Sequence, residues 1–181
     1  MTQDALFRLL AQAQQLSGHA DYTIIGSLSI LGLEADFSIP PDMAMSVDVD
    51  CYTKDDPPKI FGLTQALGEN SDYHQRFGYF LDAVGPDLAS LPDGWQARLI
   101  KVQRQALCAW FLEPNDAAVS KYARGEPRDI RWIRAGLRAG VVSSVMVHRR
   151  MRETTFLDTD EQQRARSLAQ ADRDWLERPA W

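Results

Sequence analysis

Hydrophobic residues recur at intervals of three and four at the start of the chain and change to strand-like runs soon afterwards. The apolar positions within 6–16 follow helical spacing, and Gly18 is placed to end this helix. The β-branched run 22–25 predicts a strand, and Gly26 with Ser27 predicts a tight turn after it. The chain is therefore expected to open with a helix, a strand and a turn.

Strict alternation over 46–52 predicts a second strand with two different faces. Its two valines and Cys51 lie on one face, whereas Asp48, Asp50 and Tyr52 lie on the other. The apolar face can pack against a core, which leaves the opposite face free to present polar groups. Both carboxylates are therefore expected to leave the strand on the same side.

The rest of the chain changes from strand patterns to helical patterns near residue 115. The other expected elements are helices over 27–33 and 57–67, strands over 79–84, 97–102 and 107–112, and helices over 117–123, 126–139, 141–152 and 159–177. This order predicts an α+β fold, with a mixed β-sheet and flanking helices. We expect an α/β core over 1–114 and a helical C-terminal part over 115–181, packed together as one domain.

Length and composition fit a single compact domain. A chain of 181 residues with 45% hydrophobic content can bury a core, because domains of this size bury roughly 70% of their unfolded surface. No apolar run resembles a signal peptide or reaches the roughly 20 residues of a membrane span, so no membrane partner is expected. Cys51 and Cys108 lie in strand-like apolar runs, which predicts buried thiols and a cytoplasmic location.

The net charge of −5 conceals a basic segment in the second half of the chain. Residues 98–152 carry 12 basic and 4 acidic side chains, whereas residues 1–97 carry 4 basic and 14 acidic ones. Part of this charge forms a stripe of Arg131, Arg134 and Arg138 on one expected helix. A local basic patch suits a polyanion such as a nucleotide or RNA, and a solvated helix face explains the pattern equally well.

Asp48 and Asp50 are the strongest candidates for a metal site. Carboxylates two residues apart on a strand project from one face and can bind one hard cation, whereas the same spacing on a helix makes them diverge. Asp82, within the apolar run 79–84, is the expected third carboxylate, because an ionised residue on a buried strand needs a partner. The alternatives are a solvated sheet face for the pair and a water-facing strand end for Asp82.

Gly26 and Ser27 provide a candidate phosphate site upstream of these carboxylates. Glycine at a strand-to-helix turn lets backbone N–H groups approach an anion, and the serine adds a hydroxyl donor. A phosphate site and a cation site on neighbouring strands suit nucleotide chemistry, because phosphoryl transfer depends mainly on positioning and on cations. The three histidines lack metal-ligand spacing, so no zinc site is expected.

Taken together, these motifs resemble the nucleotidyltransferase superfamily over about residues 22–140. The segments that carry the resemblance are Gly26-Ser27, 46–50, 112–121 and 125–129. More narrowly, they look like a small bacterial branch of uncharacterised and abortive-infection-toxin-like nucleotidyltransferases. In such proteins a Gly-Ser turn precedes an Asp-x-Asp strand, and a third aspartate lies on a neighbouring strand.

The resemblance implies a role for each matching residue. The implied assignments are Mg²⁺ binding by Asp48 and Asp50, nucleotide binding by Gly26, Ser27 and Lys121, membership of the branch's helical motif for Lys121 and Asp129, and a third metal or catalytic carboxylate in Asp82. The expected activity is transfer of a nucleotidyl group from a nucleoside triphosphate to an RNA or protein acceptor. Such an enzyme could be the toxin of a toxin–antitoxin pair and bind an antitoxin partner.

Two other classes of function are compatible with the sequence. The first is a non-catalytic nucleotide-binding or protein-interaction module that keeps the fold without the chemistry. The second is a DNA-binding regulator that uses the basic C-terminal helices, although the segment 98–152 shows no clear helix-turn-helix turn.

Overall fold

A computed structural model describes residues 1–33 and 38–177 of the chain. Within these residues, five strands form one mixed sheet in the order β3-β2-β1-β5-β4. Strand β1 (Asp21–Ile24) lies at the centre, antiparallel to β2 (Asp48–Thr53) and parallel to β5 (Leu107–Phe111). Strand β3 (Phe80–Ala83) is parallel to β2, and β4 (Ile100–Arg104) is antiparallel to β5. The α+β class and the mixed sheet are therefore confirmed.

Helix α1 (Gln3–Ser17) forms as the apolar spacing predicts. The Thr2 hydroxyl accepts a hydrogen bond from the backbone of Ala5 at its start, and Gly18 ends it with φ 77°. Leu6, Leu9 and Leu10 are buried in a core that also contains the inward-facing residues of the sheet, whereas Leu16 in the last turn is exposed. Val49 and Cys51 of β2 belong to this core, as the alternation predicts, whereas Val47 lies before the strand and is exposed, and Tyr52 on the opposite face is buried as well.

Two segments predicted as helices form 3₁₀-helices over all or part of their length, and a 3₁₀-helix is wound more tightly than an α-helix. Residues 27–33 form the 3₁₀-helix η1 (Ser27–Gly32), and 57–67 divide into η3 (Pro57–Leu63) and the short α2 (Thr64–Leu67). A further 3₁₀ turn, η2 (Pro41–Met43), precedes β2. Tertiary contacts decide the winding here, because Gly32 approaches Phe111 so closely that an added Cβ would lie 2.4 Å from its Cβ.

Two further differences concern the region around β3 and β4. Helix α3 (Asp72–Phe77) was not predicted, although Ser71 caps it and Gly78 ends it with φ 76°. The expected strand 97–102 begins later, at Ile100, because the 3₁₀-helix η4 (Trp95–Arg98) occupies its first residues. The strand pattern was correct, but its boundary was wrong.

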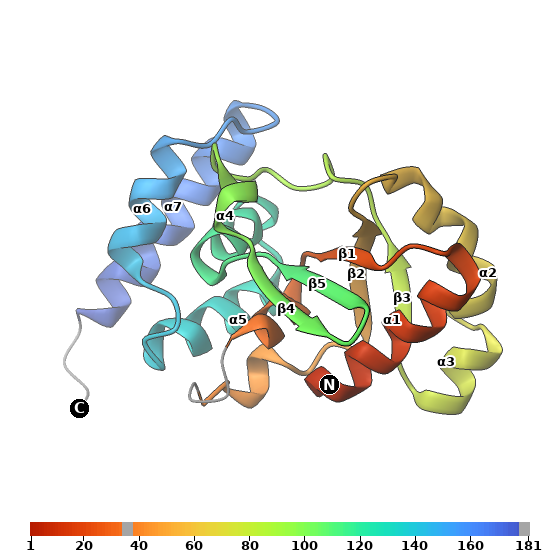
Figure 1. The fold of residues 1–181 in the computed structure, drawn as a ribbon. Helices are drawn as coiled ribbons and strands as arrows, with labels where there is room; N and C mark the ends of the chain where they lie inside the picture. Colours follow the sequence, from red (N-terminus) through yellow and green to blue (C-terminus); the bar gives the residue numbers. More distant parts are fainter. Residues whose placement is uncertain (34–37, 178–181) are drawn as a thin grey trace.

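In the described part of the chain, four helices follow β5: α4 (Pro114–Arg124), α5 (Pro127–Arg138), α6 (Ser144–Arg152) and α7 (Thr159–Leu176). In Figure 1 they gather on the left of the sheet, in teal to blue, whereas α2 and α3 lie on the right. Helix α4 contacts α5, α6 and α7 and also η1, so it connects the C-terminal helices to the turn after β1. The start of α7 is capped by the side chain of Asp158.

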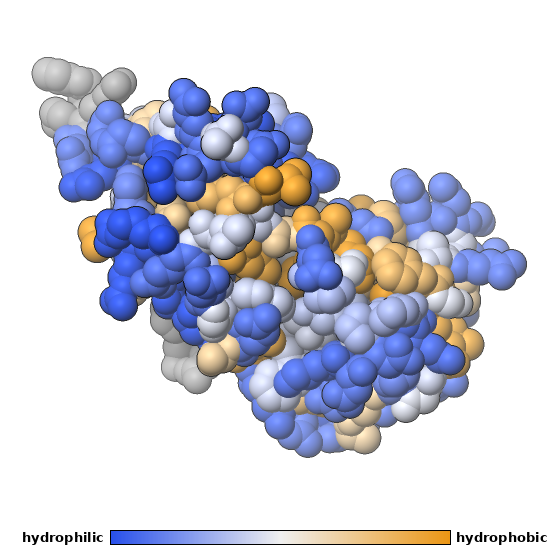
Figure 2. All heavy atoms as spheres, turned by 90° about the horizontal axis from the view of Figure 1, so that it is seen from above, coloured by the Kyte–Doolittle hydropathy of each residue, from blue (hydrophilic) through white to orange (hydrophobic). Residues whose placement is uncertain are grey.

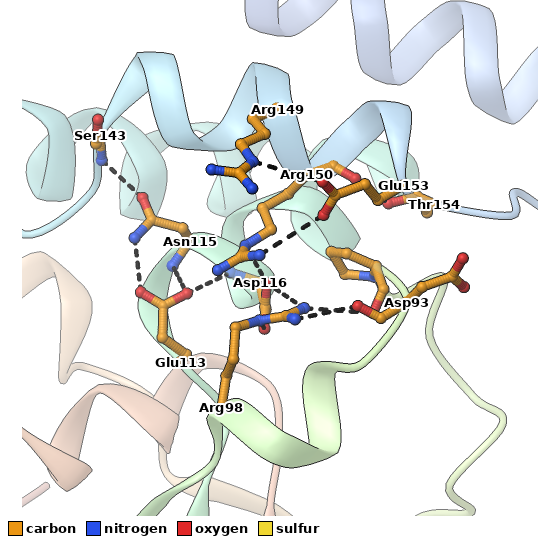
Figure 3. Close-up of polar contacts among 11 residues, drawn as sticks. Asp93, Arg98, Glu113, Asn115, Asp116, Ser143, Arg149, Arg150, Glu153 and Thr154 are labelled. Atoms are coloured by element: carbon orange, nitrogen blue, oxygen red, sulfur yellow. Dashed lines mark hydrogen bonds and ion pairs between the residues drawn. The ribbon is translucent and has the colours of Figure 1, made fainter.

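A buried network of charges fixes the loop before β4 to the C-terminal helices (Figure 3). Asp116 on α4 is fully buried and accepts two hydrogen bonds from Arg98, at 2.8 and 3.1 Å. Arg150 on α6 approaches the same carboxylate to 3.3 Å. Because a buried carboxylate is costly without partners, this network holds η4, α4 and α6 in one arrangement.

The upper face of the molecule carries a band of apolar residues between two predominantly hydrophilic regions (Figure 2). Leu88 and Leu157 are among the exposed large hydrophobic residues, and both border one surface depression together with Phe156. Among the described residues, no helix is long and apolar enough to cross a membrane.

Candidate metal and nucleotide site

Parallel pairing of β2 with β3 brings the three predicted carboxylates together. Asp50 lies opposite Asp82 in the register of the two strands, and Asp48 lies on the same face of β2. One carboxylate oxygen from each residue lies within 4.8 Å of one from each of the others. The predicted convergence is therefore present in the structure, formed by two neighbouring strands.

Burial and neighbouring carboxylates make Asp50 and Asp82 reluctant to ionise. Burial, followed by the charges of Asp48 and Asp82, raises the pKa of Asp50 to about 7. Burial and the charge of Asp48 also raise the pKa of Asp82, and Glu69 adds to this effect. A cation at this position would remove the repulsion that raises both pKa values.

The chemistry of the three carboxylates fits a hard divalent cation. Mg²⁺ prefers oxygen ligands at ~2.0–2.1 Å, so oxygens of one octahedral ion lie up to ~4.2 Å apart. Pairs of ions in two-metal sites lie ~3.5–4 Å apart. A spacing of up to 4.8 Å between the oxygens of Asp48, Asp50 and Asp82 suits a pair of ions, or a single ion after a small side-chain rotation.

Glycine is the only residue type that fits at position 26, beside Asp50. Its backbone has φ 69°, and a Cβ added there would lie 1.9 Å from Asp50 Oδ2. The backbone of Ile25 donates to the carbonyl of Asp50 at 2.9 Å, which holds the turn against β2. Antiparallel pairing of β1 with β2 thus places the glycine turn directly against the carboxylates.

Three side chains hold the turn after Gly26. Ser29 Oγ donates to the Gly26 carbonyl at 2.8 Å, and Trp132 Nε1 donates to the Ser27 carbonyl at 3.1 Å. Lys121 Nζ donates to Ser27 Oγ at 2.8 Å. Because Ser27 Oγ accepts this bond, its own proton remains free to donate to a ligand.

Lys121 belongs to a buried charge cluster with Asp129 and Arg124. The side chains of Lys121 and Asp129 are 2% and 1% exposed, and Lys121 Nζ lies 3.2 Å from Asp129 Oδ1. Arg124 donates to both oxygens of Asp129, at 2.7 and 2.6 Å. Burial alone would raise the pKa of Asp129, but the bonds from Arg124 and the charge of Lys121 hold it below its ordinary value.

A pocket of about 360 Å³ opens beside the turn and the carboxylates. It is formed by the end of β1, by β2, by α4 and α7, and by the segment after β3. Its lining residues are Ile25, Gly26, Asp50, Leu88, Ala89, Ser90, Ser120, Lys121, Arg124, Glu161 and Arg164. We call it the β1–α7 pocket. Of the sequence-predicted site residues, it contains Gly26, Asp50 and Lys121.

Ser46 and Trp132 support the candidate site through hydrogen bonds, and the sequence did not reveal these roles. Ser46 Oγ donates to Asp48 Oδ1, and Trp132 also donates to the carbonyl of Met43 at 3.0 Å. Trp132 is buried, and its two hydrogen bonds connect the segment before β2 to the turn at Ser27. The position of Ser46, two residues before the candidate ligand Asp48, is the sequence signal that could have indicated its role.

Intramolecular contacts occupy part of the predicted basic stripe. Arg134 lies 2.7 Å from Asp172, and the guanidinium of Arg138 lies 4.5 Å from the centre of the Trp175 ring. Arg131 lines a small pocket of about 200 Å³ next to Ser27. The stripe is therefore not one continuous surface for a polyanion.

The comparison with protein families assigns the chain to the nucleotidyltransferases, in agreement with the glycine turn and the adjacent carboxylates. The chain belongs to the family described as nucleotidyltransferase of unknown function (DUF6036), which it matches over residues 4–178. Comparisons with curated proteins and with solved structures gave no match.

Proposed function

We propose that this protein transfers a nucleotidyl group from a nucleoside triphosphate to a hydroxyl-bearing acceptor, with Mg²⁺ bound by Asp48, Asp50 and Asp82. The acceptor oxygen forms a bond to the α-phosphorus, the bond from that phosphorus to the bridging oxygen breaks, and pyrophosphate leaves. Bound Mg²⁺ would neutralise phosphate charge and orient the reacting oxygens. The observation that carries this proposal is the convergence of three carboxylates against the Gly26 turn.

Asp82 is the proposed base for the acceptor hydroxyl. It lies on the edge strand β3 and is less buried than Asp50, so an acceptor can reach it from solvent. A carboxylate within hydrogen-bond reach of the acceptor hydroxyl can take its proton as the oxygen attacks. The proton of the acceptor hydroxyl would move to a carboxylate oxygen of Asp82.

Gly26, Ser27 and Lys121 are the proposed nucleotide-binding residues. The missing side chain at Gly26 lets the backbone lie directly against Asp50, where a metal-bound phosphate would meet the turn, and the free proton of Ser27 Oγ can donate to a phosphate oxygen. Lys121 fixes the direction of this hydroxyl and supplies positive charge next to the pocket. Its contact with Asp129 keeps the ammonium in place.

The acceptor is proposed to be an RNA or a protein, and the proposed setting is the cytoplasm. A role as the toxin of a toxin–antitoxin pair rests on the resemblance described above. Expression of the wild type should then arrest growth of a bacterial host, and Asp50→Asn should relieve the arrest. Growth that is equally slow with both proteins would contradict the toxin role.

Transfer of radioactivity from α-³²P-labelled nucleoside triphosphates tests the proposed activity. Wild-type protein with Mg²⁺ should label an acceptor in total RNA or in a cell lysate, and chelation of Mg²⁺ should stop the transfer. Asp48→Asn and Asp50→Asn should each reduce the rate at least ~100-fold, because each removes a metal ligand. Labelling by both variants at the wild-type rate would refute the metal assignment.

The competing function is a non-catalytic nucleotide-binding or interaction module. The same experiment distinguishes it when nucleotide binding is measured in parallel. If the protein binds a triphosphate but labels no acceptor in total RNA or in the cell lysate, the non-catalytic module is favoured over the enzyme.

A further inference from the structure

The β1–α7 pocket has a cationic wall built from two helices that are far apart in the sequence. Lys121 and Arg124 come from α4, and Arg164 comes from α7. Asp50 and Glu161 are the acidic residues that line the same pocket. Helix α7 thus contributes to a pocket whose other side is formed by the glycine turn and a candidate metal ligand.

Arg164 is held in place by the end of α4. Its Nε donates to the carbonyl of Ala123 at 2.8 Å. Its stem crosses Gly125, where an added Cβ would lie 3.0 Å from Arg164 Cδ. Gly125 has φ 73° and ends α4, so the absence of a side chain there lets the arginine lie close to the backbone.

The guanidinium of Arg164 has no carboxylate partner within residues 1–33 and 38–177, which leaves its two terminal nitrogens free to bind an anion. By contrast, Arg124 and Lys121 share the carboxylate of Asp129. Mg²⁺ bound at Asp50 would neutralise the second carboxylate beside these three cations, and the wall would then carry a positive surplus. Glu161 offsets part of it, although its Oε2 already accepts bonds from Ser90 Oγ and the Leu157 backbone.

We propose that Arg164, together with Arg124, binds the β- and γ-phosphates of the nucleoside triphosphate. The proposal rests on the proposed function, because it places the α-phosphate beside Asp50 and the turn at Gly26. A triphosphate keeps negative charge after one Mg²⁺ has bound, and planar guanidinium groups match phosphate oxygens through paired hydrogen bonds. Arg164 is thus a positioning residue that selects a polyphosphate chain.

A consequence of this arrangement is that α7 is part of the substrate site. A nucleoside monophosphate ends before it reaches Arg164, so the arginine should distinguish triphosphates from monophosphates. Inorganic tripolyphosphate carries the phosphate chain without a base or a sugar, so its binding should also depend on Arg164.

Calorimetric titration of the full-length protein with Mg²⁺–tripolyphosphate, Mg²⁺–ATP and AMP tests the proposal. Arg164→Gln should weaken binding of tripolyphosphate and ATP by about tenfold or more, since it removes charge-assisted hydrogen bonds. Binding of AMP should change less than about twofold. Arg164→Lys should recover part of the loss, because it restores the charge without the paired geometry.

Arg166→Gln is the matched control, because Arg166 lies on the same helix but lines a different pocket with His148 and Asp174. It should bind all three probes like the wild type. Equal affinities of Arg164→Gln and wild type for tripolyphosphate would overturn the assignment while leaving the proposed function intact. Wild-type protein that binds neither tripolyphosphate nor ATP would overturn both proposals.

Discussion

Replacing Asp50 with asparagine should stabilise the metal-free protein at pH 8, although it removes a proposed metal ligand. Burial and the charges of Asp48 and Asp82 raise the pKa of Asp50 from 3.8 to about 7. The folded protein therefore holds an ionised carboxylate that is more favourable in the unfolded chain. Asparagine keeps the size of the side chain and removes this charge.

The size of the effect follows from the two pKa values. Each pKa unit corresponds to about 1.4 kcal/mol, so the difference between 3.8 and about 7 sets a ceiling of ~4 kcal/mol. Asp50 retains some solvent contact, which screens part of the repulsion, so we expect a gain of ~2–4 kcal/mol. A domain of this length gains ~2–4 °C in Tm for each kcal/mol.

The gain in stability from Asp50→Asn must increase with pH. Above pH 7 Asp50 is ionised in both the folded and unfolded states, so the wild type carries the full penalty. As the pH falls through the folded pKa of about 7, the folded protein takes up a proton and the wild type regains stability. Near the unfolded pKa of 3.8 the penalty is gone, so the gain at pH 5 should be less than half the gain at pH 8.

Urea denaturation of wild type and Asp50→Asn at pH 8 and pH 5, in the presence of EDTA, measures the gain. Asp55→Asn is the matched control, because Asp55 is exposed in the loop after β2. The control should change the free energy of unfolding by less than ~0.5 kcal/mol. A variant that is less stable than wild type at pH 8, or a gain that grows as the pH falls, would refute the reasoning.

Three further predictions test the charge clusters and the thiols. Lys121→Met should lower the free energy of unfolding by about 2–3 kcal/mol in urea titrations, because it leaves a buried carboxylate with one partner, whereas exposed Lys59→Met should change it little. Arg98→Met should cost about 2–4 kcal/mol in thermal unfolding, since it leaves the fully buried carboxylate of Asp116 with Arg150 as its remaining cation, and an unchanged Tm would contradict this account. Cys51 and Cys108 should react with a thiol reagent only after unfolding, because both side chains are buried and burial raises the pKa of each thiol; rapid labelling of the native protein would contradict the structure.

The sequence predicted the sheet better than the short helices. Alternation in 46–52 identified the strand and its polar face, because side chains on a strand follow a period of two. Residues 27–33 carry no comparable period, and their 3₁₀ winding depends on the contact of Gly32 with Phe111, which is distant in the chain. Local pattern therefore determined β2, whereas tertiary packing determined η1.

Some residues of the candidate site could likewise be predicted from the local sequence, whereas others depend on tertiary packing. Asp48 and Asp50 could be found from spacing, and Asp82 from an acidic residue within an apolar run. Arg164 could not be found, because its place in the site depends on the packing of α7 against Gly125 at the end of α4. The sequence left the basic stripe on α5 open between a polyanion surface and a surface paired within the protein, because the contacts of Arg134 and Arg138 with α7 are distant in the chain.

The most direct test of the account is a crystal structure of the wild type grown with Mn²⁺ and a non-hydrolysable nucleoside triphosphate analogue. Anomalous scattering would locate the metal independently of any acceptor. We expect a Mn²⁺ peak within ligand distance of Asp48 and Asp50, with the phosphates of the analogue beside Gly26. A nucleotide bound elsewhere, with no metal peak at these carboxylates, would contradict it.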